Sequence, residues 1–180
     1  MMDALILTVI LTSIPLILAA TGELIAERSG VLNLGVEGMM LMGAVAAFAI
    51  TSLSGNPYLG VMAAAAAGAM TAAIFAVFTL GLATNQVATG LALTIFGTGL
   101  SGLVGAPFVG GTVDGLQAVS IPVLSDLPVL GGLFFHLDLL AYGAFVMLAL
   151  VALFLNKSSA GLILRAVGHN HDSAHALGYS

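Results

Sequence analysis

The sequence contains no cysteine, no tryptophan and very little charge. Of its 180 residues, 3 are Lys or Arg and 8 are Asp or Glu, so only 6% are charged. Soluble domains carry about 25% charged residues, because a surface that faces water has to be polar. A soluble globular protein is therefore excluded, and so is a disordered chain, which needs low hydrophobicity and high charge. The lack of cysteine excludes disulfides and thiolate metal sites within this sequence.

What is present is apolar: 60% of the residues are hydrophobic. A helix crosses about 30 Å of hydrocarbon with about 20 apolar residues. Windows of this kind lie at 3–20, 31–53, 58–82, 87–104 and 139–155. We therefore expect an all-α fold, a polytopic transmembrane helix bundle of about five spans.

The loop between the last two windows, residues 105–138, is rich in Gly and Pro. Its middle, residues 121–130, is apolar but too short to span a bilayer, and Pro122 and Pro128 interrupt it. Irregular backbone at membrane depth has to be covered by protein. We expect a re-entrant or interfacial external segment here.

The few charges predict the orientation. Five alternating spans place every Lys and Arg, namely Arg28, Lys157 and Arg165, on one side of the membrane. The positive-inside rule makes this side cytoplasmic. We expect a multi-pass plasma membrane protein with an external N-terminus, a transmembrane domain at 1–155 and a cytoplasmic segment at 156–180.

Small residues recur along two windows at helical spacing, and lipid-embedded helices associate through such residues. We expect two helix contact faces. The third window contributes Gly60, Ala64, Gly68, Ala72 and Ala76, and the fourth contributes Gly90, Thr94, Gly97, Ser101 and Gly105.

Polar side chains within the windows are candidates for a solute path. Glu37 lies six residues into the second window, and Asn33, four residues earlier, would share its helical face. Such carboxylates normally face protein or a wet cavity. Either Glu37 lines a solute path or it is a structural carboxylate bonded to a neighbouring helix. Asn85 and Gln86 form a second polar patch, which is either part of the path or a helix cap.

The C-terminal segment predicts two short helices that could dock on a partner. Residues 161–167 read as an amphipathic run with Arg165 on its polar side, and Gly168 is expected to break it. Asn170 or Asp172 could cap a second helix that ends at Gly178.

No pattern of catalytic residues is visible in the sequence, and nucleotide-binding glycine motifs lack their strand–helix context. His169, His171 and His175 lie close in sequence, but only Asp172 stands nearby to complete a metal shell. We expect no metal, no cofactor and no enzymatic activity, with any ATP hydrolysis on another chain. An intramembrane enzyme or a channel remains an alternative class.

Several motifs resemble a known family. They are TGELIAERSGVLNLGVEGMMLMGA at 21–44, NQVATGLAL at 85–93, IPVLSDLPVLG at 121–131 and GLILRAVG at 161–168. This resembles the ABC importer permeases of the branched-chain amino acid and simple sugar group, and most of all those for nucleoside uptake. The resemblance covers about residues 15–180.

The resemblance implies residue roles. Asn33 and Glu37 fall in the motif near the translocation path, and Asn85 and Gln86 are added to it as tentative path residues. Residues of the C-terminal segment fall in the loop that couples to the ATPase, where His169 replaces the usual Glu and His171 the usual Pro. The expected coupling residues are Arg165, Gly168, His169, Asn170, Asp172, Ala174 and Gly178.

The resemblance also implies a function. We expect a permease subunit that translocates nucleosides or a related small polar solute such as a simple sugar. Its partners would be a second permease subunit, a cytoplasmic ABC ATPase, an extracytoplasmic solute-binding protein and membrane lipid, and no nucleic acid. The alternatives are a permease for branched-chain amino acids and a truncated half-permease, ending inside the coupling loop, that inserts without transporting.

Overall fold

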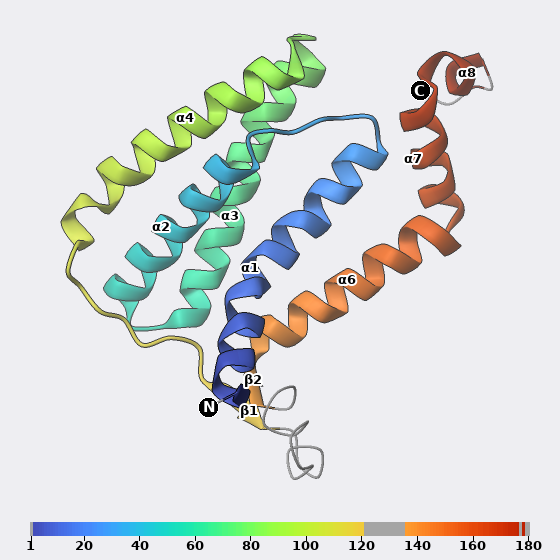
Figure 1. The fold of residues 1–180 in the computed structure, drawn as a ribbon. Coiled ribbons are helices and arrows are strands. Elements are labelled where there is room, and N and C mark those ends of the chain that lie inside the picture. Colours follow the sequence, from blue (N-terminus) through green and yellow to red (C-terminus); the bar gives the residue numbers. More distant parts are fainter. Residues whose placement is uncertain (1, 121–135, 177, 179–180) are drawn as a thin grey trace. The chain divides into compact units, whose positions relative to one another are not determined.

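Five apolar helices dominate the computed structural model, which describes residues 2–120, 136–176 and 178. By its internal contacts the chain divides into two units, Met1–Gly30 with Leu116–Ser180, and Val31–Gly115 (Figure 1). We call them the outer-sequence unit and the central unit. Each unit has its own helix packing.

The outer-sequence unit is built on α1 (Met2–Arg28) and α6 (Leu139–Lys157). The two helices pack where Ile14 meets Ala141 and Ala144, all of them buried. Alanine allows this approach because it adds little bulk between the helices. From this contact α1 and α6 diverge toward their C-terminal ends (Figure 1).

A pair of short strands, which we call the hairpin, packs against this contact. Strands β1 (Ala118–Ser120) and β2 (His136–Asp138) pair antiparallel. Leu137 is almost fully buried in the α1–α6 core. The hydroxyl of Tyr142 donates to the carbonyl of Val119 at 3.4 Å and accepts from the Leu137 amide at 3.3 Å. These bonds attach α6 to the hairpin.

Two short helices follow α6. Helix α7 (Ser159–His169) begins directly after it, and α8 (His171–Ala176) follows α7. Ser158 caps α7, because its hydroxyl accepts from the Gly161 amide at 2.9 Å. Helix α7 contacts both α6 and α1.

The central unit contains α2 (Val36–Ser54), α3 (Pro57–Ala76) and α4 (Gln86–Gly105). Helix α2 packs against both of the others. Helix α3 continues into one π-helical turn, Val77–Gly81, and α4 into a 3-10 turn, Ala106–Phe108.

Glycines bring α2 and α4 into backbone contact. A Cβ at Gly38 would lie 2.6 Å from the Leu93 carbonyl oxygen, and one at Gly97 would lie 2.6 Å from the Gly38 Cα. A Cβ at Gly105 would lie 3.2 Å from Val45. The predicted contact face on the fourth window is thereby confirmed at Gly97 and Gly105.

Over the residues that it describes, the structure confirms five spans but corrects the start of the second. Helices long and apolar enough to cross a membrane are Leu5–Arg28, Val36–Ser54, Pro57–Gly81, Gln86–Phe108 and Leu139–Lys157. Residues 31–35 are not helical, because Gly30 has a φ of +88° and the Asn33 side chain accepts from the Gly35 amide at 2.9 Å. Such side-chain bonds compete with helix formation. The predicted re-entrant segment at 121–130 lies outside the described residues.

The α2–α4 contact predicts a sharp difference between two glycines. Gly38→Ala should lower the free energy of unfolding by about 1–3 kcal/mol, because the added methyl meets backbone atoms that cannot rotate away. Gly99→Ala is the matched control on α4: its Cβ meets nothing within 4 Å. Unfolding in detergent followed by circular dichroism measures both, and equal stability of the two variants would contradict the contact.

Candidate functional sites

The first candidate site is the non-helical stretch 31–35, which we call the lead-in segment, and the part of α4 beside it. The Gln86 side chain accepts from the Leu32 amide at 2.8 Å. The Thr94 hydroxyl donates to the Leu34 carbonyl at 2.8 Å. Two α4 side chains therefore hold the lead-in segment by its backbone.

A glycine on α4 brings the lead-in segment still closer. Gly90 is buried, and a Cβ there would lie 2.8 Å from the Leu34 amide nitrogen and 3.0 Å from that of Gly35. No residue other than glycine fits this contact without a shift of the backbone. The lead-in segment is thus a fixed element of the central unit and not a loose connection.

Glu37 occupies a different place from the one expected. It lies in the first turn of α2, and its side chain is exposed. The positive end of the helix dipole favours a carboxylate at this position. Asn33 lies outside the helix, so the prediction that it shares a helical face with Glu37 is wrong. The cause is the turn in which the Asn33 side chain binds Gly35.

Asn85 and Gln86 have separate tasks at the start of α4. The Asn85 side chain accepts from the Ala88 amide at 3.0 Å, which is the helix-cap alternative. Gln86 binds the Leu32 amide, one residue before Asn33. The structure therefore brings Gln86 next to the lead-in segment and places Asn85 in a local cap.

The second candidate site is α7 with α8. The sequence predicted a helix break at Gly168. This prediction is wrong, since α7 continues to His169. The role of Gly168 is contact: a Cβ there would lie 2.7 Å from the Gly30 amide nitrogen and 2.7 Å from the Ser29 carbonyl carbon. The helix ends instead at Asn170, whose backbone is extended (φ −152°, ψ 98°).

The opposite end of α7 makes a similar contact. A Cβ at Gly161 would collide with the Phe154 carbonyl oxygen and lie 2.8 Å from the Leu155 Cα, both on α6. Arg165 is half-buried on the same face as Gly161 and Gly168 and not on an exposed polar side. Its Nε is buried, and no hydrogen-bond partner for it is found within the described part of the chain.

The remaining coupling candidates gather around α8. His169, Asn170 and Asp172 are exposed, whereas Ala174 is buried. Gly178 has a φ of +87°, the left-handed conformation expected after a helix end. No group of three or more His, Cys, Asp or Glu able to hold a metal occurs among the residues that the structure describes.

The stripe predicted on the third window meets α2 only in part within the described residues. A Cβ at Gly60 would collide with the Thr51 hydroxyl and lie 2.8 Å from the Ala47 carbonyl oxygen, and a Cβ at Gly43 would lie 3.4 Å from the Ala64 carbonyl oxygen. A Cβ at Gly68 meets nothing within 4 Å. Ala72 is exposed and Ala76 half-buried, so a contact face there stays a prediction.

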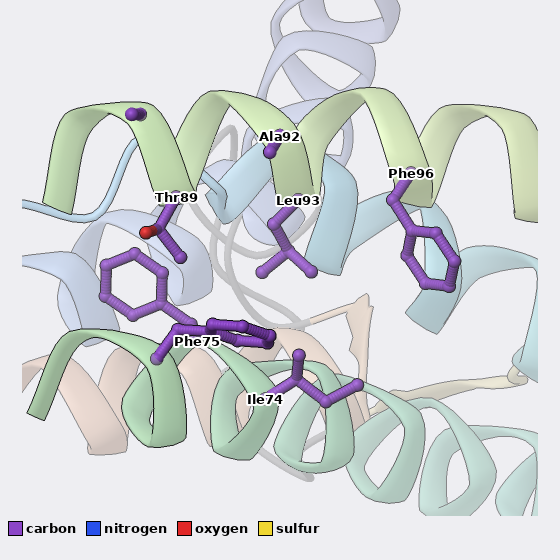
Figure 2. Close-up of a pocket in the computed structure, with 8 residues that line it drawn as sticks. Ile74, Phe75, Thr89, Ala92, Leu93 and Phe96 are labelled. Atoms are coloured by element: carbon purple, nitrogen blue, oxygen red, sulfur yellow. The ribbon is translucent and has the colours of Figure 1, made fainter. Parts of the chain in front are cut away.

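Between α3 and α4 lies an apolar cleft of about 510 Å³. Figure 2 shows Ile74 and Phe75 of α3 facing Leu93 and Phe96 of α4 across it. Among the described residues that line the cleft, Thr89 is the one with a polar side chain, and its hydroxyl pairs with that of Thr84 at 2.9 Å. The cleft therefore suits hydrocarbon better than a polar solute.

Sequence reasoning missed the contact made by Gly161, and it placed Thr94 on a contact face without predicting the hydrogen bond from its hydroxyl to Leu34. Gly161 and Gly168 are seven residues apart, a spacing that puts both on one helical face, and this was the available signal. Nothing local in the sequence indicated that Thr94 reaches the Leu34 carbonyl.

Comparison with known proteins gives a family for nearly the whole chain. The model described as "Branched-chain amino acid transport system / permease component" matches residues 5–180. A protein of Haloferax volcanii, provisionally named as a glucose ABC transporter permease, is 41% identical over 91% of this chain and 51% of its own length. No solved structure matches.

Two further relatives are bacterial. The guanosine ABC transporter permease protein of Bacillus subtilis is 32% identical over 91% of this chain and 55% of its own length. The nucleoside ABC transporter permease protein of Lactococcus lactis is 30% identical over 98% and 59% respectively. The chain thus spans about half the length of the curated relatives it matches.

The lead-in segment yields a prediction about Thr94. Thr94→Val removes the donor to the Leu34 carbonyl and should cost about 1–2 kcal/mol of stability, with faster amide exchange at 31–38. Thr98→Val is the matched control, because the Thr98 hydroxyl binds only within its own helix, to the Thr94 carbonyl. Hydrogen exchange measured by mass spectrometry compares the two variants. Unchanged exchange in Thr94→Val would argue against the hydrogen bond from Thr94 to the lead-in segment.

Proposed function

Because the chain belongs to the family of permease components of branched-chain amino acid transport systems, we propose that it forms part of the membrane pathway of an ATP-binding cassette importer. The observation that supports this proposal most directly is the family match over residues 5–180. The chain is a multi-pass membrane protein, and the part of it that the structure describes contains five helices able to span a bilayer.

We propose nucleosides or simple sugars as the solute class. Relatives named for glucose, guanosine and nucleoside transport support this range. The chain would act as a transport subunit, with ATP hydrolysis on a separate cytoplasmic ATPase. A second permease subunit and an extracytoplasmic solute-binding protein would complete the importer.

Glu37 and the lead-in segment are the proposed solute-path residues of this chain. Glu37 is an exposed carboxylate at the start of a membrane span, where an unpartnered charge facing lipid is unfavourable. A wet path removes that cost, and a carboxylate can accept hydrogen bonds from the hydroxyl groups of a sugar or ribose. Gln86 and Thr94 hold the adjoining backbone in place.

Helices α7 and α8 are the proposed docking element for the ATPase, with 1–155 as the transmembrane domain and 156–180 as the coupling segment. Exposed polar residues (His169, Asn170 and Asp172) at the α7–α8 junction support this assignment. The arrangement requires this segment in the cytoplasm and the N-terminus outside. All three basic residues would then lie on the cytoplasmic side, as the positive-inside rule demands.

Uptake tests the role of Glu37. In the complete importer, Glu37→Gln should raise the KM for the solute about tenfold, the equivalent of about 1.4 kcal/mol, because one charge-assisted hydrogen bond is lost. Glu27→Gln, a change of an exposed carboxylate at the end of α1, should leave KM within about twofold. Radiolabelled uptake into cells measures both, and equal KM values would remove Glu37 from the path.

Labelling of single cysteines tests the orientation, since residues 1–180 contain no cysteine of their own. Asp172→Cys should react with an impermeant maleimide only after the cells are opened, whereas Asp114→Cys should react in intact cells. Both side chains are exposed, so burial does not confound the comparison. Labelling of Asp172→Cys from outside would refute the proposed coupling role.

A further inference from the structure

Helix α7 touches two membrane helices through two glycines on one of its faces. Near its start, Gly161 lies against the Phe154–Leu155 backbone of α6. In its last turn, Gly168 lies against the Arg28–Gly30 backbone at the end of α1. Both are backbone-to-backbone contacts, because neither glycine has a side chain to interpose.

The two membrane helices that α7 contacts, α1 and α6, also contact each other. Ile14 of α1 packs on Ala141 and Ala144 of α6, in the buried core beside the hairpin. From Ile14 to Arg28, α1 rises about 20 Å, and α6 rises about 20 Å from Ala141 to Leu155. Between Gly161 and Gly168, α7 covers about 10 Å. Two long arms diverge from one contact, and α7 bridges their ends (Figure 1).

We propose that Gly161 and Gly168 are positioning residues that make α1, α6 and α7 one rigid triangle. Three stiff members in contact at three corners cannot change their angles independently. A displacement of α7 therefore moves the C-terminal ends of α1 and α6 together. Without the Gly168 corner, α7 would swing about its junction with α6 and leave α1 behind.

The role of the triangle in transport rests on the proposed function, since α7 belongs to the segment that we propose docks on the ATPase. In transport terms, the triangle delivers the movement of the docked segment to two membrane helices at once. Both helices receive it through backbone atoms. The Gly30 φ of +88° turns the chain sharply at this corner, directly after α1.

The experiment measures one distance in the complete importer, reconstituted in liposomes with its ATPase. Spin labels at Glu27→Cys and Asn156→Cys, both exposed, report the separation of the α1 and α6 ends. With the native glycines, the separation should stay within about 2 Å between the nucleotide-free and ATP-bound states. A larger change on ATP binding would overturn the rigid triangle, whatever any variant does.

The variant arm uses Gly168→Ala, whose Cβ would collide with the Arg28 carbonyl oxygen. The distance distribution should broaden, and uptake should fall at least about tenfold with the solute KM unchanged and ATP hydrolysis within about twofold. Gly22→Ala on α1 and Gly143→Ala on α6 are the controls, because a Cβ at either meets nothing within 4 Å. Both should keep the native distance and uptake.

The outcomes separate this inference from the proposed function. Native distance and native uptake in Gly168→Ala would overturn the triangle while leaving an importer intact. Lack of solute uptake by the unsubstituted importer would refute the proposed function. The nucleotide-free distance distribution would still decide the geometry, because that measurement needs no transport.

Discussion

Close contact between backbones at glycines is the interaction that pairs α2 with α4 and that holds α7 against α1 and α6. Hydrocarbon gives apolar helices no reason to associate, so stable packing in a bilayer requires very close approach. The chain achieves it with glycine at Gly38 and Gly97 in the central unit, and at Gly161 and Gly168 in the outer-sequence unit. At each of these positions the partner atoms belong to the main chain. This explains how a chain with 6% charged residues still specifies defined helix pairs.

The spans were predictable because a transmembrane helix satisfies its own backbone hydrogen bonds and needs only length and apolarity. The start of α2 could not be predicted in this way. Residues 31–35, in which the Asn33 side chain binds the Gly35 amide, are as apolar in sequence as the helix that follows. The β1–β2 hairpin was also missed. Its strands are three residues each, and residue 118 pairs with residue 138, so no local pattern reveals them.

For the candidate sites, sequence reasoning found the important residues more readily than their roles. Gly168 was singled out as a helix break, yet the structure uses it as a contact with Gly30. A glycine suits both purposes, and only a partner more than a hundred residues away decides between them. Glu37 was similarly placed too deep, because the turn at Asn33 shifts the helix start. Its proposed involvement in solute passage rests on the chemistry of a carboxylate and on the family of the chain.

The α2–α4 crossing has a consequence for how these two helices can move relative to each other. Where Gly38 seats against Gly97, any sliding of one helix along the other would drive a neighbouring side chain into the notch that each glycine leaves. The two helices therefore pack in a single register. Movement between α2 and α4 has to be taken up at the ends of these helices, and the turns at 31–35 and 82–85 are where the main chain leaves regular helix.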